Sequence, residues 1–499
     1  MQRRLVQDDK PADSLSNKAN GVRIAVVGGG FSGIAVAYYL KKAKLDNFLV
    51  FESSSDPGGV WNDSRYPGAE VDAVSHLYCF TFNIHDWSQR YGSQAELKHY
   101  LGKTVDEFGL RPHFRFDATV TSAVWSDSGK HYTVSFADGR QMEFDIVISC
   151  VGTLNIPQIP PNIDMAAFPG TAVHTSRWRD DISLEGKRVG VIGTGASAVQ
   201  IVAEAARVAQ SVTIFQRSPT WVVPKKNRVF TTRQRTRYGT QWQYRYKFFK
   251  EFLRYERVKI FGRSGQEGSR TNRLLRAVAN FHLKQSLAGR PDLLEKLTPD
   301  HAFGAKRPIA SDAYYPALRQ ENVRLAAAVA RLGADGLLDE RGGRHDLDVV
   351  ILATGFRAAD YLSRLKITGR NGTDLHATWN GEPAAFLGCC VPGFPNFFMT
   401  NGPNSAAGVQ VFILECQAQF AAGCIADMAR KGGSTVEVKT SAFDGFNSWI
   451  QASLETSIYK TTRNYYASPS GRIVTQWPFS GTRFWWISKT ARRSSMTTS

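Results

Sequence analysis

The sequence predicts an α/β protein with two Rossmann-like domains and a helical insert. Three observations support this prediction. Two glycine-rich loops, at residues 28–33 and 193–198, each lie between a short apolar run typical of a buried strand and a longer run typical of a helix. A basic and aromatic stretch at residues 221–300 follows the second unit and has a helical period. The chain has 499 residues, of which 42% are hydrophobic, and this length allows two or three domains.

The first unit is "VRIAVVGGGFSGIAVAYYLKK", in which Gly28, Gly30 and Gly33 follow the pattern G-x-G-x-x-G. Glycines at this spacing let the backbone turn sharply and approach a pyrophosphate, whose negative charge then lies at the N-terminus of the helix. The next strand, "FLVFE", ends in Glu52, which is placed to accept hydrogen bonds from a ribose diol. This order of elements predicts a dinucleotide site.

The second unit, "KRVGVIGTGASAVQIVAEAARVAQSVTIFQR", repeats the arrangement with Gly193, Gly195 and Ala198 in the loop. Alanine is a tolerated variant of the third glycine. We expect Ser197 and Gln200, at the start of the helix, to contact the cofactor of this loop. The chain therefore contains a second predicted dinucleotide site.

The residue that ends the second strand of each unit distinguishes the two sites. Glu52 follows Gly28 by 24 residues, and Arg217 follows Gly193 by the same 24 residues. An acid at this point repels a ribose 2′-phosphate, whereas Arg217 would pair with one. The sequence therefore predicts FAD or NAD at the first loop and NADP at the second.

The positive charge of the chain is concentrated in one segment. The formal net charge is +18, and residues 221–300 contribute +13 of it, with 19 Lys and Arg against 6 Asp and Glu. Within this segment Tyr244, Phe248 and Phe252 recur at every fourth residue, as on one face of a helix. We expect this helix to bury its aromatic face and to leave its Lys and Arg in water. A surface for an acidic partner or a membrane is the alternative.

The remaining composition bears on compartment and metal binding. The six cysteines include no C-x-x-C pair, which argues against a dithiol redox centre and against thiolate metal sites, and no metal is predicted. A reducing cytoplasm suits them as small buried side chains. No run approaches 18 consecutive apolar residues, so no transmembrane segment is expected. The polar leader at residues 1–20 lacks a signal-peptide core and is expected to be a disordered arm.

Two further motifs lie outside the glycine loops. The stretch "FPGTAVHTSRW" follows F-x-G-x-x-x-H-x-x-x-W in Phe168, Gly170, His174 and Trp178. The pattern G-G-x-W-x-x-x-x-Y-P-G-x-x-x-D is complete in Gly58, Gly59, Trp61, Tyr66, Pro67, Gly68 and Asp72. With the two loops in this order, the motifs resemble those of the type I Baeyer-Villiger monooxygenases, flavoproteins that insert an oxygen atom beside a ketone. The resemblance covers nearly the whole chain, although Arg179 stands where the family usually has Pro or Asp after the tryptophan.

The resemblance implies an enzyme that uses FAD, NADPH and dioxygen to convert a small-molecule ketone into an ester or lactone through a flavin peroxide. It implies that Arg307, in "FGAKRPIASDAYY", is the active-site arginine and that Asp72 lies beside it. It also implies that Lys306 faces the NADP 2′-phosphate together with Arg217. A related flavin monooxygenase that oxidises nitrogen or sulfur is the alternative. Such an enzyme has less use for an anion-stabilising arginine.

Other residues receive roles from the same resemblance. Gly59, Trp61 and Tyr78 are implied to help hold the flavin. Tyr465 stands where the family commonly has a Ser-Trp-Tyr-like run, and it is a candidate contact to substrate or cofactor. The basic segment is implied to be a helical cap over the substrate pocket, so nucleic-acid binding is not expected.

The expected domain order follows from these assignments. The predicted parts are a disordered arm at 1–20, a discontinuous FAD-binding domain at 21–155 and 380–485, an NADP-binding domain at 165–220 and 301–365, a cap at 221–300 and a flexible tail at 486–499. The stretch from Phe168 to Trp178 is interpreted as a hinge, in which the chain crosses between the domains at Gly170 and is held by His174 and Trp178. His174 is assigned to this linker and not to acid-base chemistry.

Overall fold

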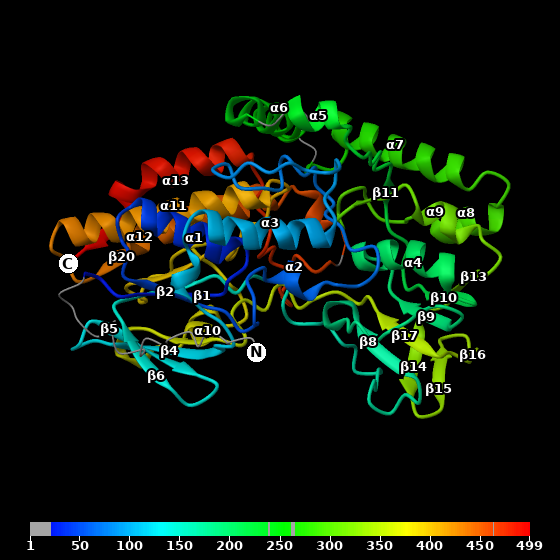
Figure 1. Ribbon diagram of the computed structural model, residues 1–499, viewed down its shortest axis with the longest axis horizontal. Helices are drawn as coiled ribbons and strands as arrows, with labels where there is room; N and C mark the ends of the chain where they lie inside the picture. Colours follow the sequence, from blue (N-terminus) through cyan, green and yellow to red (C-terminus); the bar gives the residue numbers. More distant parts are fainter. Residues whose placement is uncertain (1–20, 238–239, 261–264, 463) are drawn as a thin grey trace, which may run out of the picture.

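Two parallel sheets form the two halves of the protein, on the left and the right of Figure 1. The computed structural model describes residues 21–237, 240–260, 265–462 and 464–499, so the predicted arm at 1–20 lies outside the described residues. Each sheet has five strands, and each contains one of the two predicted glycine-loop units.

The first sheet has the strand order β19-β7-β1-β2-β3, and all its neighbouring strands are parallel. The strands are β1 (Ile24–Val27), β2 (Phe48–Phe51), β3 (Phe114–Arg115), β7 (Ile146–Ser149) and β19 (Phe397–Met399). Every residue of β1, β2, β7 and β19 is buried, as in parallel sheets that are covered on both faces. Because β19 follows the second sheet in the sequence, segments that are far apart in the chain build this half.

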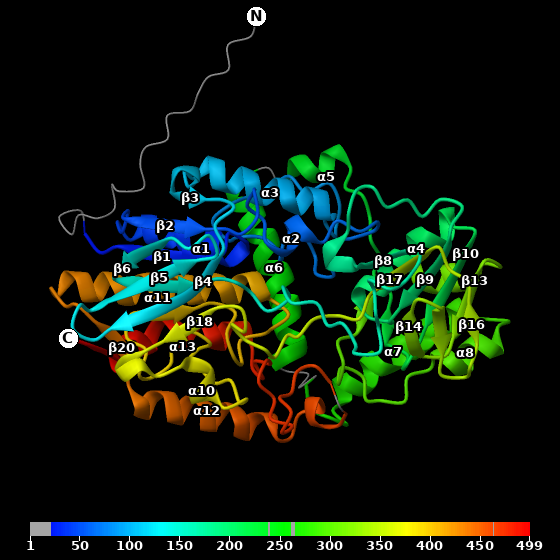
Figure 2. The ribbon, with the colours of Figure 1, turned by 90° about the horizontal axis from the view of Figure 1, so that it is seen from below.

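Long helices cover the first sheet (Figures 1 and 2). Helix α1 (Phe31–Lys42) follows the first glycine loop and packs against α11 (Gln410–Arg430), which in turn packs against α13 (Gly481–Ser495). The 21-residue α11 has the length and apolar composition that a membrane span needs, with a mean hydropathy of 1.2, but 72% of its apolar window is buried inside the protein. These contacts account for its apolar sequence as part of the core.

The second sheet has the order β13-β10-β9-β17-β8 and is also parallel throughout. Its strands are β8 (Thr171–His174), β9 (Arg188–Ile192), β10 (Ser211–Phe215), β13 (Val323–Ala326) and β17 (Val349–Leu352). Helix α4 (Ala196–Val208) follows the second glycine loop and packs on β9 and β10. The apolar runs at 144–152 and 347–356 form β7 and β17, each the strand beside a glycine-loop strand.

Smaller elements connect and flank the two sheets. A four-stranded sheet contains β18 (Lys366–Thr368), β4 (Val120–Ser126), β5 (His131–Phe136) and β6 (Gln141–Phe144), and a three-stranded one contains β14 (Val329–Gly333), β15 (Gly336–Asp339) and β16 (Arg344–His345). A short parallel pair joins β11 (Val222–Val223) to β12 (Ile309–Ala310). The remaining helices include α2 (Val60–Asp63), α3 (Gln94–Glu107), α9 (Tyr314–Leu318), α10 (Leu375–Trp379) and α12 (Thr440–Leu454).

The basic segment is helical and spans both halves along the upper edge of Figure 1. It contains α5 (Thr232–Arg237), α6 (Gln241–Ile260), α7 (Arg270–Ser286) and α8 (Pro291–Leu297). Tyr244 and Phe252 of α6 are buried in the core of the first half and Phe248 packs against it, so the predicted aromatic face is buried. Leu283 of α7 and Leu293 of α8 belong instead to the core of the second half. The insert therefore packs against both halves.

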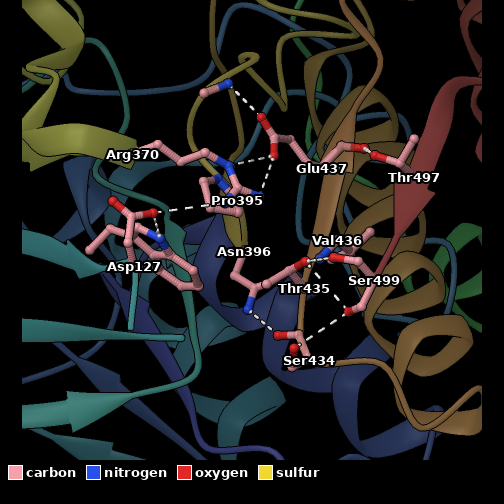
Figure 3. Close-up of polar contacts among 12 residues, drawn as sticks. Asp127, Arg370, Pro395, Asn396, Ser434, Thr435, Val436, Glu437, Thr497 and Ser499 are labelled. Atoms are coloured by element: carbon pink, nitrogen blue, oxygen red, sulfur yellow. Dashed lines mark hydrogen bonds and ion pairs between the residues drawn. The ribbon is translucent and has the colours of Figure 1, made fainter. Parts of the chain in front are cut away.

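The predicted flexible tail at 486–499 is wrong. Helix α13 continues to Ser495, and β21 (Met496–Thr498) pairs antiparallel with β20 (Val436–Val438). The backbone N–H groups of Ser434 and Thr435 both donate to the carbonyl oxygen of Ser499 at 2.8 Å (Figure 3). The polar composition of the segment suggested a loose end, but an antiparallel ladder satisfies its backbone without needing apolar side chains.

Candidate active site

The first glycine loop is closed by contacts that leave no room for side chains. Gly28 has φ +107°, and a Cβ there would lie 2.6 Å from the carbonyl oxygen of Cys150. A Cβ on Gly33 would lie 1.9 Å from the carbonyl oxygen of Gly28. Gly59 faces Gly30, and a Cβ on Gly59 would lie 3.0 Å from the Cα of Gly30, so the second motif packs directly on the loop.

Glu52 lies at the end of β2 beside this loop and is buried. Its Oε2 accepts a hydrogen bond of 2.6 Å from the backbone N–H of Gly29, and its Oε1 accepts one of 2.9 Å from Ser54. Its Oε1 also accepts from the hydroxyl of Ser53 at 3.2 Å, whereas Oε2 can still accept a second hydrogen bond and so keeps acceptor capacity for a ribose diol. Glu52 therefore shapes the loop as well as being the predicted ribose partner.

The starts of α1 and α4 fit the pyrophosphate groups of dinucleotides. Neither Gly30 nor Gly195, which precede these helices, carries a side-chain cap, and the first turns of both helices contain no acidic residue. A Cβ on Gly195 would meet no atom within 4 Å, so the space beside the second loop is open. Uncapped N–H groups and a helix dipole at an open approach suit a bound phosphate.

The second loop resembles the first but is wider at its third position. Gly193 has φ +116°, and a Cβ there would lie 2.5 Å from the carbonyl oxygen of Ala353. Ala198, at the place of Gly33, accommodates its methyl group in the core of this half. The alanine in the fingerprint therefore reflects a looser contact between the helix and the strand.

Two cations lie together at the end of β10. Arg217 is exposed, and Nζ of Lys306 donates to the hydroxyl of Ser218 at 3.1 Å. Burial lowers the pKa of Lys306, and the charge of Arg217 lowers it further. Since these like charges repel each other, a doubly negative phosphate between them would relieve the repulsion, as the predicted 2′-phosphate site requires.

Replacement of Arg217 by alanine tests this phosphate site. We expect the Michaelis constant for NADPH to rise roughly tenfold to a hundredfold, because a charged hydrogen bond to the phosphate is lost, while that for NADH stays unchanged. The exposed Arg207, which pairs with Glu204 on α4, provides the control variant Arg207→Ala. Equal changes for the two nucleotides in Arg217→Ala would exclude Arg217 as the phosphate contact.

Asp72 and Arg307 meet although 235 residues separate them in the sequence. The Nε of Arg307 donates to Oδ2 of Asp72 and its second terminal nitrogen to Oδ1, both at 2.7 Å. The side chain of Arg307 is 55% exposed and that of Asp72 is 23% exposed. Burial alone would raise the pKa of Asp72, but the charge and hydrogen bonds of Arg307 outweigh it and lower this pKa. The pair is therefore ionised, with one edge of the guanidinium held and the other turned to the open side.

The C-terminal segment brings a tyrosine close to this pair. The side-chain amide of Asn464 donates to the carbonyl oxygen of Ala305 at 3.1 Å, two residues before Arg307. Tyr465 is 48% exposed, and its hydroxyl donates to that of Tyr466 at 3.3 Å. Burial raises the pKa of Tyr465, and the positive charge of Arg307 counteracts the rise. Tyr465 thus lies within electrostatic reach of Arg307, where a contact to substrate or cofactor was predicted.

Trp61 and Tyr78 form the third part of the candidate site. The indole N–H of Trp61 donates to the hydroxyl of Tyr78 at 3.2 Å. The ring of Tyr78 packs edge-on against Phe31, the first residue of α1, with the ring centroids 5.2 Å apart. Burial raises the pKa of Tyr78 to about 12, so this hydroxyl stays protonated. Both predicted flavin contacts therefore lie at the start of the helix that follows the first loop.

Comparison with known proteins agrees with this arrangement. A family model described as flavin-binding monooxygenase-like matches residues 21–256. A Baeyer-Villiger monooxygenase of Streptomyces coelicolor is 32% identical over 475 residues, which cover 92% of this chain and 89% of that protein. The chain belongs to the Baeyer-Villiger monooxygenase family. The predicted family is thereby confirmed.

Two further comparisons extend the likeness. A Baeyer-Villiger monooxygenase of Pseudomonas aeruginosa is 32% identical over 479 residues, covering 92% of this chain and 88% of that protein. The crystal structure of cyclohexanone monooxygenase from Rhodococcus sp. Phi1 bound to NADP+ matches with a TM-score of 0.86 at 26% identity, covering 96% of this chain and 99% of that one. The predicted fold class, with two Rossmann-like domains and a helical insert, is confirmed.

In this member of the monooxygenase family, a tyrosine joins the two halves in a way that sequence reasoning missed. The hydroxyl of Tyr66 donates to Oε1 of Gln200 at 2.7 Å and lies 3.2 Å from the hydroxyl of Ser197, which can donate to it. The amide nitrogen of Gln200 donates to the carbonyl oxygen of Glu70 at 2.8 Å. Gly68 packs so closely on α4 that a Cβ would lie 3.0 Å from the carbonyl oxygen of Gln200. Gln200 and Ser197, predicted as cofactor contacts, also anchor this loop to α4.

Lys225 is a second group that sequence reasoning missed. Its side chain is buried, forms an ion pair with Glu70 and lies 4.8 Å above the ring of Tyr91. Its charge also contributes to lowering the pKa of Asp72. The basic run "PKKN" gave no signal for this role, because adjacent lysines in a basic segment are usually solvated.

The chain crosses between the halves earlier than predicted. Gly170 already packs in the second half, where a Cβ would lie 2.4 Å from the carbonyl oxygen of Asp348. Ile163 already belongs to the core of the second half and forms a bridge with Leu332, so the chain crosses before Ile163 and not at Gly170. Phe168 and Trp178 are buried in this half, and the divergent Arg179 forms an exposed ion pair with Asp181. Gly170 therefore serves a close contact within the second half and is not the crossing point. Movement at this segment stays a prediction.

His174 ends β8 as a structural side chain. Its Nδ1 accepts from the backbone N–H of Ser176 at 3.2 Å, so its Nε2 carries the proton and donates to the carbonyl oxygen of Gly355 at 3.1 Å. Burial lowers the pKa of His174, which keeps the ring neutral. The hydrogen bond of Nε2 ties the edge strand to the loop after β17, and that of Nδ1 caps the turn that follows β8, in keeping with the predicted role outside acid-base chemistry.

Replacement of His174 by alanine is expected to lower the free energy of unfolding by about 3 kcal/mol, because two buried backbone groups lose their partners. The folded protein binds a proton at His174 less readily than the unfolded chain, whose histidine pKa is about 6.5. The stability contributed by His174 is therefore complete above this pH and declines as the pH falls below it. Urea unfolding at several pH values measures both effects, with His99→Ala, at an exposed position of α3, as control. A variant as stable as the wild type at pH 8 would contradict this role.

Proposed function

We propose that this chain is an FAD- and NADPH-dependent monooxygenase that converts a small-molecule ketone into an ester or lactone with dioxygen. The observation that carries the proposal is the bidentate pair of Asp72 and Arg307, whose guanidinium is held on one edge and exposed on the other. When bound, FAD supplies oxygen-activating redox chemistry and NADPH supplies the reducing equivalents. The chain itself must then stabilise negative charge at the reacting carbonyl.

Arg307 is suited to that task. The charge of Asp72 raises its pKa, so the guanidinium stays positive at every working pH. Oxygen attack on a ketone places negative charge on the carbonyl oxygen, and a preorganised cation there lowers the barrier. Asp72 positions Arg307, because two parallel hydrogen bonds fix both the plane and the direction of the guanidinium. Tyr465 offers a hydroxyl beside the same space.

The cofactor assignments follow the geometry of the two loops. We assign FAD to the loop of Gly28 with Glu52, Trp61 and Tyr78, and NADP to the loop of Gly193 with Arg217 and Lys306. The corresponding domain proposal is 21–155 with 380–485 for FAD and 165–220 with 301–365 for NADP, and the continuity of each parallel sheet supports it. The proposed compartment is the cytoplasm, supported by six buried cysteines without a disulfide among the described residues.

A panel of substrates tests the proposal. The flavin-loaded protein is incubated with NADPH, air and cyclic ketones, linear ketones, sulfides and tertiary amines in parallel, and products are identified by mass spectrometry. We expect esters or lactones from at least one ketone class, since Arg307 stabilises the anion that this reaction forms. Products limited to sulfoxides and amine oxides would favour the alternative oxygenation of sulfur or nitrogen.

A further inference from the structure

The outer face of the insert carries exposed apolar side chains in helical order. On α6 these are Trp242, Tyr246, Phe249 and Leu253, at steps of four, three and four residues. With 3.6 residues per turn they lie within an arc of about 60°. Trp242 is 75% exposed and stacks on Tyr246 with the ring planes 9° apart. Since the opposite face of α6 fills the core of the first half, the helix is aromatic on both sides.

Helix α7 repeats the pattern. Leu274, Val278 and Phe281 are exposed at steps of four and three residues, and Phe281 is 67% exposed. Both α6 and α7 lie in the outer layer at the upper edge of Figure 1. We name these seven residues of α6 and α7 the apolar stripe. Exposed apolar residues are ordinary when scattered singly, but helical rows of them on two helices of one insert mark an interaction surface.

Exposed cations border the apolar stripe. Arg245, Lys250 and Arg257 do so on α6, and Arg270 and Lys284 on α7. Among the described residues, none of these five side chains lies within 4 Å of a carboxylate, although Lys247 and Glu251 pair on the inner side of α6. The face therefore combines large apolar side chains with cations that have no carboxylate partner within 4 Å. A partner for this face must offer both an apolar region that the side chains can enter and negative charge for the cations.

We propose that the apolar stripe and its bordering cations bind the surface of an anionic lipid bilayer. The headgroup layer offers phosphate oxygens to Arg and Lys, and the acyl boundary receives Trp, Phe and Leu. A second copy of the chain fits poorly, because a symmetric contact would bring like charges together. An acidic protein partner would be bound mainly by a compact cluster of large side chains at the centre of the interface. The apolar stripe instead extends along two helices, as in helices that lie at a membrane surface. The surface is distinct from the proposed catalytic residues.

Vesicle sedimentation tests the inference. The flavin-loaded protein is mixed, at low and high salt, with neutral vesicles of phosphatidylcholine or with anionic vesicles that also contain roughly 30 to 40 per cent phosphatidylglycerol. We expect binding to the anionic vesicles that weakens as salt screens the charges, and little binding to the neutral ones. Trp242→Ser/Phe281→Ser should weaken binding at least about tenfold, and Arg245→Gln/Lys250→Gln roughly 30-fold at low salt.

Two matched variants separate this surface from general charge and stickiness. Val124→Ser/Val208→Ser removes two exposed apolar residues elsewhere, and Arg341→Gln/Arg344→Gln removes the same charge from the β15–β16 hairpin. Both controls should bind vesicles like the wild type, and all four variants should keep their flavin and their activity without vesicles. The proposal is overturned if the wild-type protein does not bind anionic vesicles, or if the control variants lose binding to the same extent. It is also overturned if the wild type forms a dimer that Trp242→Ser/Phe281→Ser dissociates.

Discussion

Replacement of Arg307 by alanine is expected to abolish ester formation while leaving the flavin bound. The guanidinium lies outside the glycine loop to which we assign the flavin pyrophosphate, so cofactor retention should not depend on it. Loss of one preorganised donor to a developing oxyanion costs about 100- to 1000-fold in rate. Arg307 also carries the full positive charge, so the loss should reach the upper end of this range. Product yield per NADPH consumed, measured beside the flavin absorbance, reports both properties.

The control for this variant is Arg179→Ala. Arg179 also contacts a carboxylate through two nitrogens, with distances of 3.0 and 3.5 Å to Asp181, but this carboxylate is 69% exposed, against 23% for Asp72. We expect Arg179→Ala to retain activity, since exposed ion pairs contribute little to stability. Asp72→Asn should keep the flavin and lower the rate less than Arg307→Ala, because the cation remains but loses part of its orientation. Ester formation by Arg307→Ala at a near-normal rate would refute the assigned role.

Replacement of Gly33 by alanine is expected to prevent formation of the flavin-bound protein. The added Cβ would lie 1.9 Å from the carbonyl oxygen of Gly28, at the junction of α1 with the loop to which we assign the pyrophosphate. Backbone atoms cannot move aside as a flexible side chain can, so we expect a loss of more than about 4 kcal/mol in unfolding free energy. Flavin content and the urea midpoint of purified protein measure the effect.

Gly102 supplies the matched control. It lies inside α3, and a Cβ there would meet no atom within 4 Å. Gly102→Ala should therefore raise stability by about 0.5 to 1 kcal/mol, because alanine favours the helix. If Gly33→Ala bound flavin with wild-type stability, the close contact between α1 and the loop would not exist in solution.

The sequence predicted the two nucleotide units well because their signals are local. A buried strand, a glycine turn and a helix leave a pattern within about 30 residues, and the acid or base at the end of the next strand distinguishes them. The meeting of Asp72 with Arg307 has no such local signal, since 235 residues separate the two. That pair came from family resemblance alone. The contact of Tyr66 with Gln200 was missed because a motif residue does not reveal its partner across the two halves.

Two expectations failed, both where tertiary contacts override composition. The polar tail pairs as β21 with β20, since backbone hydrogen bonds do not require apolar side chains. The chain does not cross at Gly170, where the lack of a side chain instead permits a close contact with Asp348. The buried face of α6 was predicted from its period. Helix α6 also has an aromatic face that is exposed, and the sequence alone does not show which of the two aromatic faces packs against the core.

Oxygen-isotope labelling of the product tests the proposed ketone oxygenation most directly. The flavin-loaded protein is supplied with NADPH, the best ketone of the panel and dioxygen labelled with oxygen-18, and the ester is analysed by mass spectrometry. We predict one labelled atom per ester molecule, at the oxygen inserted between the carbonyl carbon and the migrating carbon. NADPH consumption that yields hydrogen peroxide and unchanged ketone, or an ester without label, would contradict the proposal.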